Sequence, residues 1–408
     1  MASALTPADE RQLLELMLHM AARKTPVEIV GGGSKRALGR PVEAEHRIAL
    51  SGLSGIELYE PEELVLTAWA GTRLALIESA LATHRQMLAF EPVDYGPLLG
   101  GAPGAATIGG VLAANLSGPR RPKAGAARDH FLGAEGVSGR AAAFKSGGRV
   151  VKNVTGYDLC KLLAGSYGTL AVMTKVTVKV LPAPETERTL LIHGLDDARA
   201  IEALTLAMQS PHEVSGAAHL PVAAAAALDV PGAGHGGRPL PAVRVEGFAP
   251  SVAARAAALR ELLGGFGELS ERDGEISAAL WRALRDALPF ARLPDTHAVW
   301  RLSVPPAGGA AVAAAIEAAA PVQVFYDWAG GLIWVAVDPL PDAGQGAVRQ
   351  AVAAAGGHAT LIRATAEQRA TLNVFQPQPG PLAELTRRVK ESFDPYRILN
   401  RGRIYPDL

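Results

Sequence analysis

Two glycine-rich segments near the start of the chain have the composition of a phosphate-binding site. The first is Gly31-Gly32-Gly33-Ser34-Lys35, and the second runs from Gly100 to Gly110. Consecutive backbone N–H groups can hold a pyrophosphate only where the chain approaches it closely, and side chains larger than hydrogen prevent that approach. Ser34 would add a hydroxyl donor and Lys35 a positive charge. Taken alone, a triple glycine is more often a tight turn between a strand and a helix.

The second segment repeats this pattern over a longer loop, which makes an ordinary turn a weaker explanation. Its candidate binding residues are Pro103, Gly104, Thr107, Ile108, Gly109 and Gly110. Asn115, Ser117 and Gly118 follow, with amide and hydroxyl groups that could bond the polar edge of a ring. We expect no periodic helix or strand between residues 96 and 118, and an irregular loop of this length in a compact domain is usually functional.

The elements that would position these loops can be predicted from periodicity. A helix is expected over residues 6–24, because Thr6 is a suitable N-cap and a proline follows at the first helical position. An apolar strand over 27–30 runs directly into the first glycine segment, and another is expected over 64–70. Alternating apolar residues over 170–180 predict a half-buried strand.

The composition changes after this strand. Residues 181–184 read Leu-Pro-Ala-Pro, which ends the strand and suggests a domain boundary. From about 185 to 385 the chain is rich in alanine, and its pattern indicates a separate α+β domain. The expected helices include 252–263 and 276–288, the expected strands 242–248 and 298–304, and a hairpin is expected from 322–328 and 332–337. A last helix is expected near 382–393.

The composition also excludes several classes of function. The chain has 408 residues with 40 basic and 40 acidic side chains, so no net field attracts nucleic acid. Its single cysteine, Cys160, excludes an internal disulfide, a cysteine-ligated zinc site and a protein-held iron–sulfur cluster. No signal peptide and no apolar run of membrane-spanning length is present, so we expect a cytoplasmic protein that contacts the inner membrane only through partner subunits.

Five motifs, taken in order, resemble those of the FAD-binding domain of the vanillyl-alcohol oxidase (PCMH) type. They are Gly31-Gly32-Gly33-Ser34, Ala106 to Gly110, Arg128-Asp129 with Leu132-Gly133, Lys152-Asn153-Val154-Thr155-Gly156-Tyr157-Asp158, and Gly165 to Leu170. The segments 151–158, 374–381 and 393–405 further resemble the family of FAD-binding subunits of bacterial glycolate oxidase, also called glycolate dehydrogenase. The likeness runs almost from end to end of the chain.

The resemblance implies an α+β fold, in which a two-subdomain FAD-binding domain over 1–183 is followed by an α+β cap domain over 184–385. Residues 386–408 would return to the FAD-binding domain. Residues 31–35 and 103–110 would surround the pyrophosphate, while residues 107–110, Asn115, Ser117 and Gly118 would lie towards the ribityl chain and ring. Leu170 and Val172 would border the adenine, and Asn400 would come from the returning tail. The remaining expected cofactor-binding residues are Arg128, Asp129, Lys152, Asn153, Thr155, Gly156, Tyr157, Asp158 and Gly168. Some relatives bind flavin covalently through histidine or cysteine. Ser34 follows the first glycines here and neither loop contains a cysteine, so we expect non-covalent FAD.

The sequence departs from the histidine-rich metal motif of several hydroxy-acid dehydrogenases of this superfamily. Its ten histidines are scattered, and no metal site is expected. His297 and His358 are expected to be ordinary polar residues at the starts of strands. Oxidation of a 2-hydroxy acid needs a cation for the carboxylate and a base for the hydroxyl proton. The cap offers Arg282, Arg285, Arg301 and Arg363, but no motif marks a catalytic residue.

Three functions agree with these features. The first is a FAD-binding subunit of a glycolate oxidase, which would oxidise glycolate to glyoxylate together with a second flavin subunit and an iron–sulfur subunit. The second is a stand-alone FAD-dependent dehydrogenase for another 2-hydroxy acid, such as D-lactate. The third is a non-catalytic subunit that keeps FAD for electron transfer or assembly.

Overall fold

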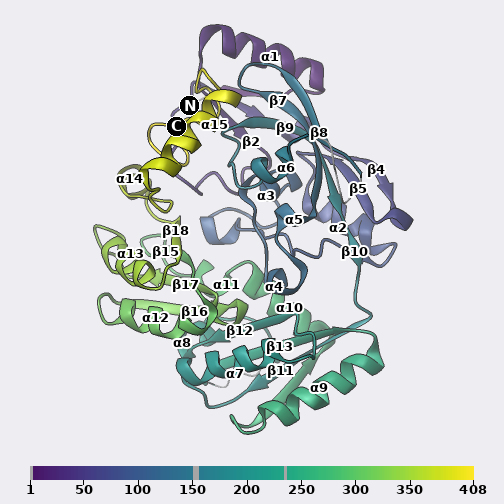
Figure 1. Ribbon diagram of the computed structural model, residues 1–408, viewed down its shortest axis with the longest axis vertical. Coiled ribbons are helices and arrows are strands. Elements are labelled where there is room, and N and C mark those ends of the chain that lie inside the picture. Colours follow the sequence, from purple (N-terminus) through teal and green to yellow (C-terminus); the bar gives the residue numbers. More distant parts are fainter. Residues whose placement is uncertain (1–2, 150–155, 234–236) are drawn as a thin grey trace.

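The N-terminal part of the molecule contains two sheets (Figure 1). The computed structural model describes residues 3–149, 156–233 and 237–408. The smaller sheet is parallel, with the order β1-β3-β2. The larger one is antiparallel, with the order β4-β5-β9-β7-β8. Their strands are β1 (Ser3–Leu5), β2 (Val27–Val30), β3 (His46–Ala49), β4 (Ile56–Glu60), β5 (Val65–Trp69), β7 (Phe131–Ser138), β8 (Ala143–Gly147) and β9 (Ala171–Lys179).

Helix α1 (Glu10–Arg23) packs on these sheets through one apolar stripe, in which Leu13, Met17 and Met20 are buried. The N-cap is Asp9, whose carboxylate accepts a hydrogen bond from the Gln12 N–H at 2.8 Å. The prediction that Thr6 caps this helix was therefore wrong. A carboxylate one residue before the helix satisfies an unpaired N–H group, and Thr6 lies too far upstream to do so.

The second correction concerns residues 96–118, where no periodic element was expected. Helix α3 (Ile108–Ala114) begins in this segment, with the Thr107 hydroxyl as N-cap acceptor for the Gly110 N–H. The helix forms because Ile108, Val111 and Leu112 are fully buried, and this burial outweighs the poor helix propensity of its two glycines.

An eight-stranded sheet forms the core of the second half of the chain, with the order β14-β11-β13-β12-β16-β17-β15-β18. Its strands are β11 (Thr186–Ile192), β12 (Gly216–Leu220), β13 (Leu240–Gly247), β14 (Leu269–Asp273), β15 (Ala298–Ser303), β16 (Val322–Asp327), β17 (Leu332–Val337) and β18 (His358–Arg363). The predicted hairpin is confirmed, since β16 and β17 pair antiparallel.

The two faces of this sheet pack against different parts of the molecule. On one face, side chains such as Trp300 and Val335 pack with the helices α7 (Asp197–Gln209), α9 (Ala249–Leu263), α12 (Gly309–Glu317) and α13 (Gln345–Ala354). On the other, Val299 and Trp334 share a core with the N-terminal sheets. Because side chains alternate along a strand, Arg301 lies on this inner face, two residues from Val299.

The remaining helices are short or lie at the edges. They are α2 (Leu74–Ala82), α4 (Arg121–Ala124), α5 (Ala127–His130), α6 (Leu159–Leu163), α8 (Val222–Ala226), α10 (Gly274–Arg285), α11 (Leu288–Ala291) and α14 (Ala366–Thr371). The helix expected over 276–288 ends earlier than predicted, because Ala287 adopts a left-handed backbone with φ 52°. The strands β6 (Gln86–Met87) and β10 (Leu181–Pro182) form a separate two-stranded antiparallel ladder. Along the chain, β10 directly precedes the first strand of the eight-stranded sheet.

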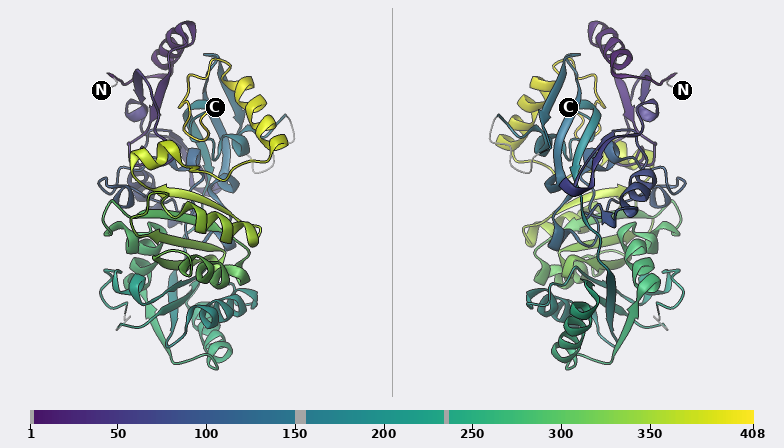
Figure 2. Two further views of the ribbon diagram at one scale, coloured as in Figure 1. Left: turned by 90° about the vertical axis from the view of Figure 1, so that its left-hand side faces the viewer. Right: turned by 90° about the vertical axis from the view of Figure 1, so that its right-hand side faces the viewer.

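The end of the chain returns to its beginning, as the views in Figure 2 show. Helix α15 (Gly380–Phe393) lies against the N-terminal half, and Leu399 forms a parallel bridge with Val27 of β2. The Val27 N–H donates to the Ile398 carbonyl at 2.8 Å, and the Asn400 N–H donates to the Val27 carbonyl at 3.1 Å. The division into domains at 183 and 385 stays a prediction. The first limit falls between β10 and β11, and the second falls inside α15.

Candidate functional site

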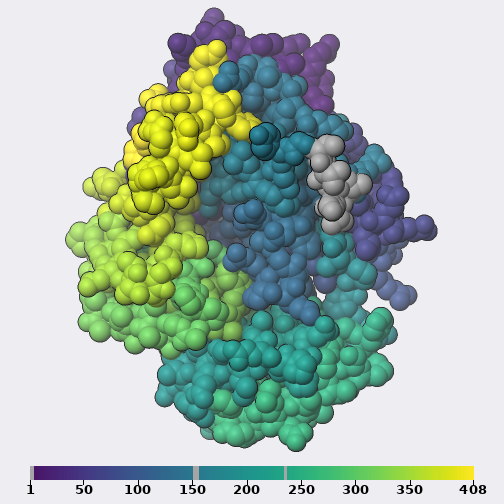
Figure 3. All heavy atoms as spheres, viewed as in Figure 1, coloured from purple at the N-terminus to yellow at the C-terminus, as the bar shows by residue number. Residues whose placement is uncertain are grey.

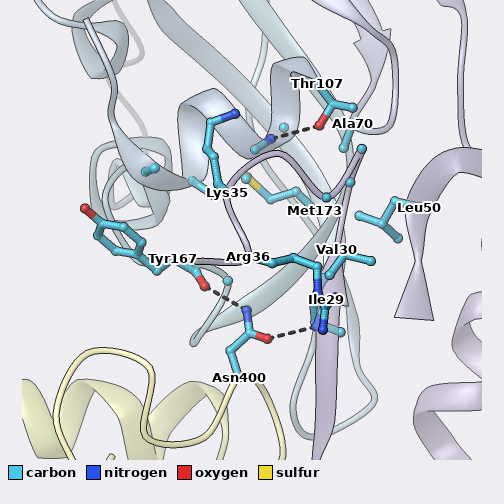
Figure 4. Close-up of a pocket in the computed structure, with 18 of the residues that line it drawn as sticks. Ile29, Val30, Lys35, Arg36, Leu50, Ala70, Thr107, Tyr167, Met173 and Asn400 are labelled. Atoms are coloured by element: carbon cyan, nitrogen blue, oxygen red, sulfur yellow. Dashed lines mark hydrogen bonds between the residues drawn. The ribbon is translucent and has the colours of Figure 1, made fainter. Parts of the chain in front are cut away.

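A cavity lies between β2 and β9 and is lined by residues of both sheets and of the loops between them. Figure 4 shows how its side chains converge from both sheets and from the returning tail. The lining residues that the sequence predicted are Gly31, Gly32, Gly33, Ser34, Lys35, Thr107, Gly109, Gly110, Gly168 and Asn400. The structure therefore brings both glycine segments and the tail into one site.

The two glycine segments touch each other, and only glycine allows this. A Cβ atom on Gly32 would lie 1.8 Å from the carbonyl oxygen of Ala105, and one on Gly31 would lie 2.2 Å from the Thr107 hydroxyl oxygen. Within the described chain the N–H groups of Gly32 and Gly33 donate no hydrogen bond, so they remain available to a phosphate. The first glycine segment is therefore more than a tight turn between a strand and a helix, because it forms one wall of a cavity.

Lys35 supplies the positive charge of this wall. Its Nζ donates to the Ser34 hydroxyl at 3.2 Å, and in Figure 4 its side chain extends towards the residues of α3. Burial lowers the pKa of Lys35 to about 8, although the carboxylates of Asp94 and Asp286 act in the opposite direction. A bound diphosphate would stabilise the protonated amine, so this residue suits an anionic ligand.

The opposite part of the cavity is apolar and suits a flat ring. It includes Ile29, Leu38 and Leu50 together with Ala171 and Met173 of β9. Leu170 and Val172, which were expected to border the adenine, do not line this cavity. Their neighbours Ala171 and Met173 line it, because side chains one residue apart on a strand lie on opposite faces of the sheet. Val172 is fully buried there.

Asn400 closes the site from the tail. Its Oδ1 accepts a hydrogen bond from the Ile29 N–H at 2.8 Å, and its Nδ2 donates to the Tyr167 carbonyl at 2.8 Å (Figure 4). Gly168 has φ 69°, and a Cβ atom there would lie 2.8 Å from the Asn400 Nδ2. The tail therefore fixes the position of the strand that carries the first glycine segment.

Several predicted residues of the second loop lie outside the cavity lining. Pro103 and Gly104 are exposed, and the Gly104 N–H donates to the Asp94 carboxylate at 2.6 Å. Ile108 is fully buried in the core. Asn115 ends α3, and its Oδ1 accepts a hydrogen bond from the Arg128 N–H at 3.0 Å.

The other predicted residues hold neighbouring loops in place. The Ser117 hydroxyl accepts from the Ala127 N–H at 2.8 Å, and Asp129 accepts from the Ala126 N–H at 2.8 Å. Gly118 packs closely against Glu91 and Arg285. Gly156, Tyr157 and Asp158 do not line the cavity; Tyr157 is 90% exposed, and Asp158 caps α6. Lys152, Asn153 and Thr155 lie outside the described residues.

Sequence reasoning missed about half of the lining. These residues are Ile29, Val30, Arg36, Leu38, Leu50, Ala70, Ala113, Ala114, Tyr167, Ala171, Met173 and Arg403. Most are apolar residues that are indistinguishable in sequence from core residues. Tyr167 could have been found, because it is an aromatic residue inside the Gly-Ser-Tyr-Gly motif that precedes β9.

Cys160 is a packed residue under β8. Its thiol contacts the Ser146 carbonyl at 3.7 Å, and burial with the nearby Asp158 carboxylate raises its pKa to about 11. A protonated thiol is a poor nucleophile. No cysteine or histidine is found among the residues that line the described cavity. Non-covalent attachment of the flavin stays a prediction.

Comparisons with known proteins agree with this geometry. The FAD binding domain family matches residues 1–144. The glycolate oxidase subunit GlcE of Escherichia coli (strain K12) is 34% identical over 397 residues, which is 97% of this chain and 97% of that protein. The glycolate oxidase subunit GlcD of Bacillus subtilis (strain 168) is 29% identical over 190 residues, 46% of this chain and 39% of that protein.

A solved structure shows the fold of the whole chain. The 4-ethylphenol oxidase from Gulosibacter chungangensis, in complex with isoeugenol, superposes with a TM-score of 0.73 at 13% identity, covering 99% of this chain and 89% of that one. The fold and the site thus define a FAD-binding oxidoreductase of the vanillyl-alcohol oxidase (PCMH) type, with an α+β cap. The chain belongs to the family of the glycolate oxidase subunit GlcE.

The described residues contain neither a membrane-spanning helix nor a cluster of metal-ligating side chains. No helix there is long and apolar enough to cross a bilayer. No group of three or more histidine, cysteine or carboxylate side chains in the same part of the chain is arranged to hold a metal ion.

Proposed function

We propose that this chain is the FAD-binding subunit of a glycolate oxidase complex that converts glycolate to glyoxylate. The observation that carries the proposal is the match to GlcE over 97% of both chains. A match of this extent includes the FAD-binding half, the cap and the returning tail, so it relates the whole architecture and not only the cofactor site.

The residues of the cavity support a role in holding FAD. Gly32 and Gly33 offer N–H groups and Lys35 a charge to the pyrophosphate, while Ala171 and Met173 offer an apolar surface to a flat ring. Bound FAD supplies an acceptor for the hydride of a CH–OH group. Asn400 keeps the two walls in register, because it bonds to Ile29 on one side and to Tyr167 on the other.

The proposal includes partner subunits. Electrons must leave the flavin, and a chain with a single cysteine cannot ligate an iron–sulfur cluster by itself. We therefore propose a second, related flavin subunit and an iron–sulfur subunit as partners. The match to GlcD, which is a separate subunit in its own organism, supports the presence of a related flavin chain.

An anaerobic titration tests the proposal. The purified chain, alone and co-expressed with candidate partners, would be titrated with glycolate and followed by the flavin absorbance. We expect glycolate to bleach the flavin of the co-expressed complex. Denaturation with acid should release all of the flavin into the supernatant, because the attachment is expected to be non-covalent.

The same titration separates the alternatives. Faster bleaching by D-lactate than by glycolate would favour a stand-alone dehydrogenase for a larger 2-hydroxy acid. A non-catalytic subunit is favoured by the absence of a metal cluster in the described residues. If this chain is a non-catalytic subunit, glycolate will reduce only the flavin of the partner directly. The flavin of this chain will stay oxidised until electrons arrive from the partner.

A further inference from the structure

Arg301 differs from the other arginines of the cap that were considered as carboxylate ligands. Arg282 pairs with Glu275 at 3.2 Å, and Arg285 pairs with Asp286 at 2.8 Å. Arg363 donates to the carbonyls of Leu98, His297, Phe290 and Pro294. Arg301 forms no ion pair with a carboxylate anywhere in the described chain. Its charge is therefore not neutralised by a partner at contact distance.

Arg301 shares an aromatic ring with a second arginine. The guanidinium carbon of Arg301 lies 5.0 Å from the ring centroid of Trp328, and that of Arg121 lies 4.4 Å from the same centroid. Arg121 also lacks an ion pair in the described part of the chain. Two like charges at one ring repel each other, and an anion between or beside them would relieve that repulsion.

The ring that holds the two arginines is itself fixed. The Trp328 Nε1 donates to the Gly118 carbonyl at 3.1 Å, and the Trp328 N–H donates to the Asp327 carboxyl at 2.7 Å. Trp328 and Ala329 both adopt left-handed backbone conformations, each with φ 53°. Such strain costs about 1–3 kcal/mol per residue and is found mostly at functional sites.

The surrounding ionisable groups do not neutralise the pair. Arg121 and Arg301, together with Arg349, lower the pKa of His358, after the larger effect of burial. Burial raises the pKa of Asp327 to about 7, although Arg301 is close enough to act against that shift. Burial and the charge of Arg301 lower the pKa of Arg121, and Asp129 acts against that shift without forming an ion pair with Arg121. The local charge is therefore positive at neutral pH.

The pair lies where the cap faces the flavin cavity. In the β15–β17 register Arg301 is directly opposite Trp334, whose ring meets Tyr95 of the N-terminal half edge to face at 5.7 Å. Arg301 also acts against the burial that raises the pKa of Tyr167, a residue of the cavity lining. Figure 3 shows the surface hollowed between the yellow C-terminal segment and the blue residues of the N-terminal half.

We infer that Arg301 and Arg121, stacked on Trp328, bind the carboxylate of a small 2-hydroxy acid at the mouth of the flavin cavity. The inference rests on the proposed function for its choice of ligand. A guanidinium group matches a planar carboxylate with two parallel hydrogen bonds, and this geometry favours a carboxylate over a tetrahedral anion.

Oxalate tests the inference, because it is a planar carboxylate that has no C–H bond to oxidise. Its binding would be measured by calorimetry on the flavin-loaded protein, alone and co-expressed with partners, and compared with neutral glycolamide and inorganic phosphate. Arg301→Met and Arg121→Met should each weaken oxalate binding by roughly tenfold or more, since each removes a charge-assisted contact. Arg301→Lys should restore part of the affinity.

The control is Arg199→Met. Arg199 also stacks on an aromatic ring, at 4.5 Å from Phe266, but it is ion-paired with Glu202 on the far side of the cap sheet. Its loss should leave oxalate binding unchanged. The flavin-to-protein ratio of each variant reports folding, and the exposed Arg121 gives a variant with little risk of unfolding.

Three results would overturn the inference: no oxalate binding by the native protein, unchanged affinity in both arginine variants, or equal affinity for phosphate. The proposed function is tested separately. If oxalate binding depends on both arginines while glycolate fails to bleach the flavin of the complex, the carboxylate site stands and the glycolate oxidase assignment fails. If glycolate is oxidised and the arginine variants bind oxalate normally, the glycolate oxidase assignment stands and the carboxylate site fails.

Discussion

At the residue scale, the site depends on glycines, because they have no side chain that would keep the two loops apart. Gly31 and Gly32 let the first loop lie against the second, at distances that any Cβ atom would fill. The atoms that would close around a pyrophosphate are therefore backbone atoms, which carry no sequence signature beyond glycine itself.

Gly32→Ala should abolish FAD binding, because the new Cβ would lie 1.8 Å from the Ala105 carbonyl oxygen, a backbone atom that cannot rotate away. The measurement is the ratio of flavin to protein absorbance after purification. Gly308→Ala is the matched control, since its Cβ would meet nothing within 4 Å. A Gly32→Ala protein with a full complement of flavin would show that the loops do not form the cradle.

Asp327→Asn should stabilise the protein at alkaline pH. Burial raises the pKa of this carboxyl from 3.8 to about 7, so the folded state binds a proton that the unfolded state has lost between these values. Stability is then lost as the pH rises from about 4 through 7. The asparagine avoids this loss and keeps an oxygen for the Trp328 N–H.

We expect the melting temperature of Asp327→Asn to match that of the native protein near pH 4 and to exceed it at pH 8.5. The corresponding difference in the free energy of unfolding at pH 8.5 should be of the order of 1 to 4 kcal/mol, since one pKa unit corresponds to about 1.4 kcal/mol. Asp229→Asn is the control, because Asp229 is exposed. A difference that is independent of pH would contradict the raised pKa.

Individual residues also show what could not be predicted from the sequence. The alternation of β9 was predicted correctly, but both of its faces are buried, with Val172 on one and Met173 on the other. A period of two reveals that neighbours face opposite ways and not which of them faces a cavity. Arg121 was missed for a different reason, because its significance comes from Trp328, which lies more than 200 positions away.

At the element scale, α3 and the returning tail illustrate two ways in which tertiary contacts override local signals. Gly109 and Gly110 argue against a helix, but a Cβ atom on Gly109 would lie 2.7 Å from Ala70. Glycine is therefore required for packing in the first turn of this helix. The helix α15 was predicted from its sequence pattern. The burial of charged side chains on this helix could not be predicted, because buried charges need partners that only the folded structure supplies.

Asp394→Ala should destabilise the protein by about 3–5 kcal/mol, because it leaves Lys390 buried without its partner. The two side chains meet at 2.8 Å, and the Asp394 carboxylate also accepts from the N–H groups of Ile398 and Leu399. Chemical denaturation measures the free energy of unfolding. The control is Glu384→Ala on the exposed side of the same helix, which should cost less than about 1 kcal/mol.

An equal effect of the two substitutions would show that the tail is not held by this pair. Loss of the tail should also lower the flavin content, because Asn400 follows directly after the residues that Asp394 fixes.

At the scale of the whole molecule, four buried charges join the cap to the flavin-binding half. Glu91 and Arg120 belong to the N-terminal half, and Arg244 and Glu246 to β13. Arg244 meets Glu91 at 2.9 Å, and Arg120 meets Glu246 at 2.6 Å. Burial would raise the pKa of the Glu91 carboxyl, but Arg244 and Arg120 hold it below its usual value.

Glu91→Ala should therefore destabilise the protein by about 3–5 kcal/mol, because two buried guanidinium groups lose their common carboxylate. The matched control is Glu213→Ala, which removes an exposed ion pair with Lys123 across the same two halves and should cost less than about 1 kcal/mol. Thermal unfolding measured at two salt concentrations compares them. A small effect of Glu91→Ala would mean that apolar packing alone holds the cap in place.

The returning tail sets an order of events during synthesis. Val27 pairs with Leu399, and Ile29 bonds to Asn400 across 371 positions, so β2 cannot reach its final arrangement until residues 399 and 400 have left the ribosome. The glycine loop that follows β2 matures with it. A chain that stopped before residue 399 would carry every glycine of the loops and still lack the contacts that fix β2 and Tyr167 around the pocket.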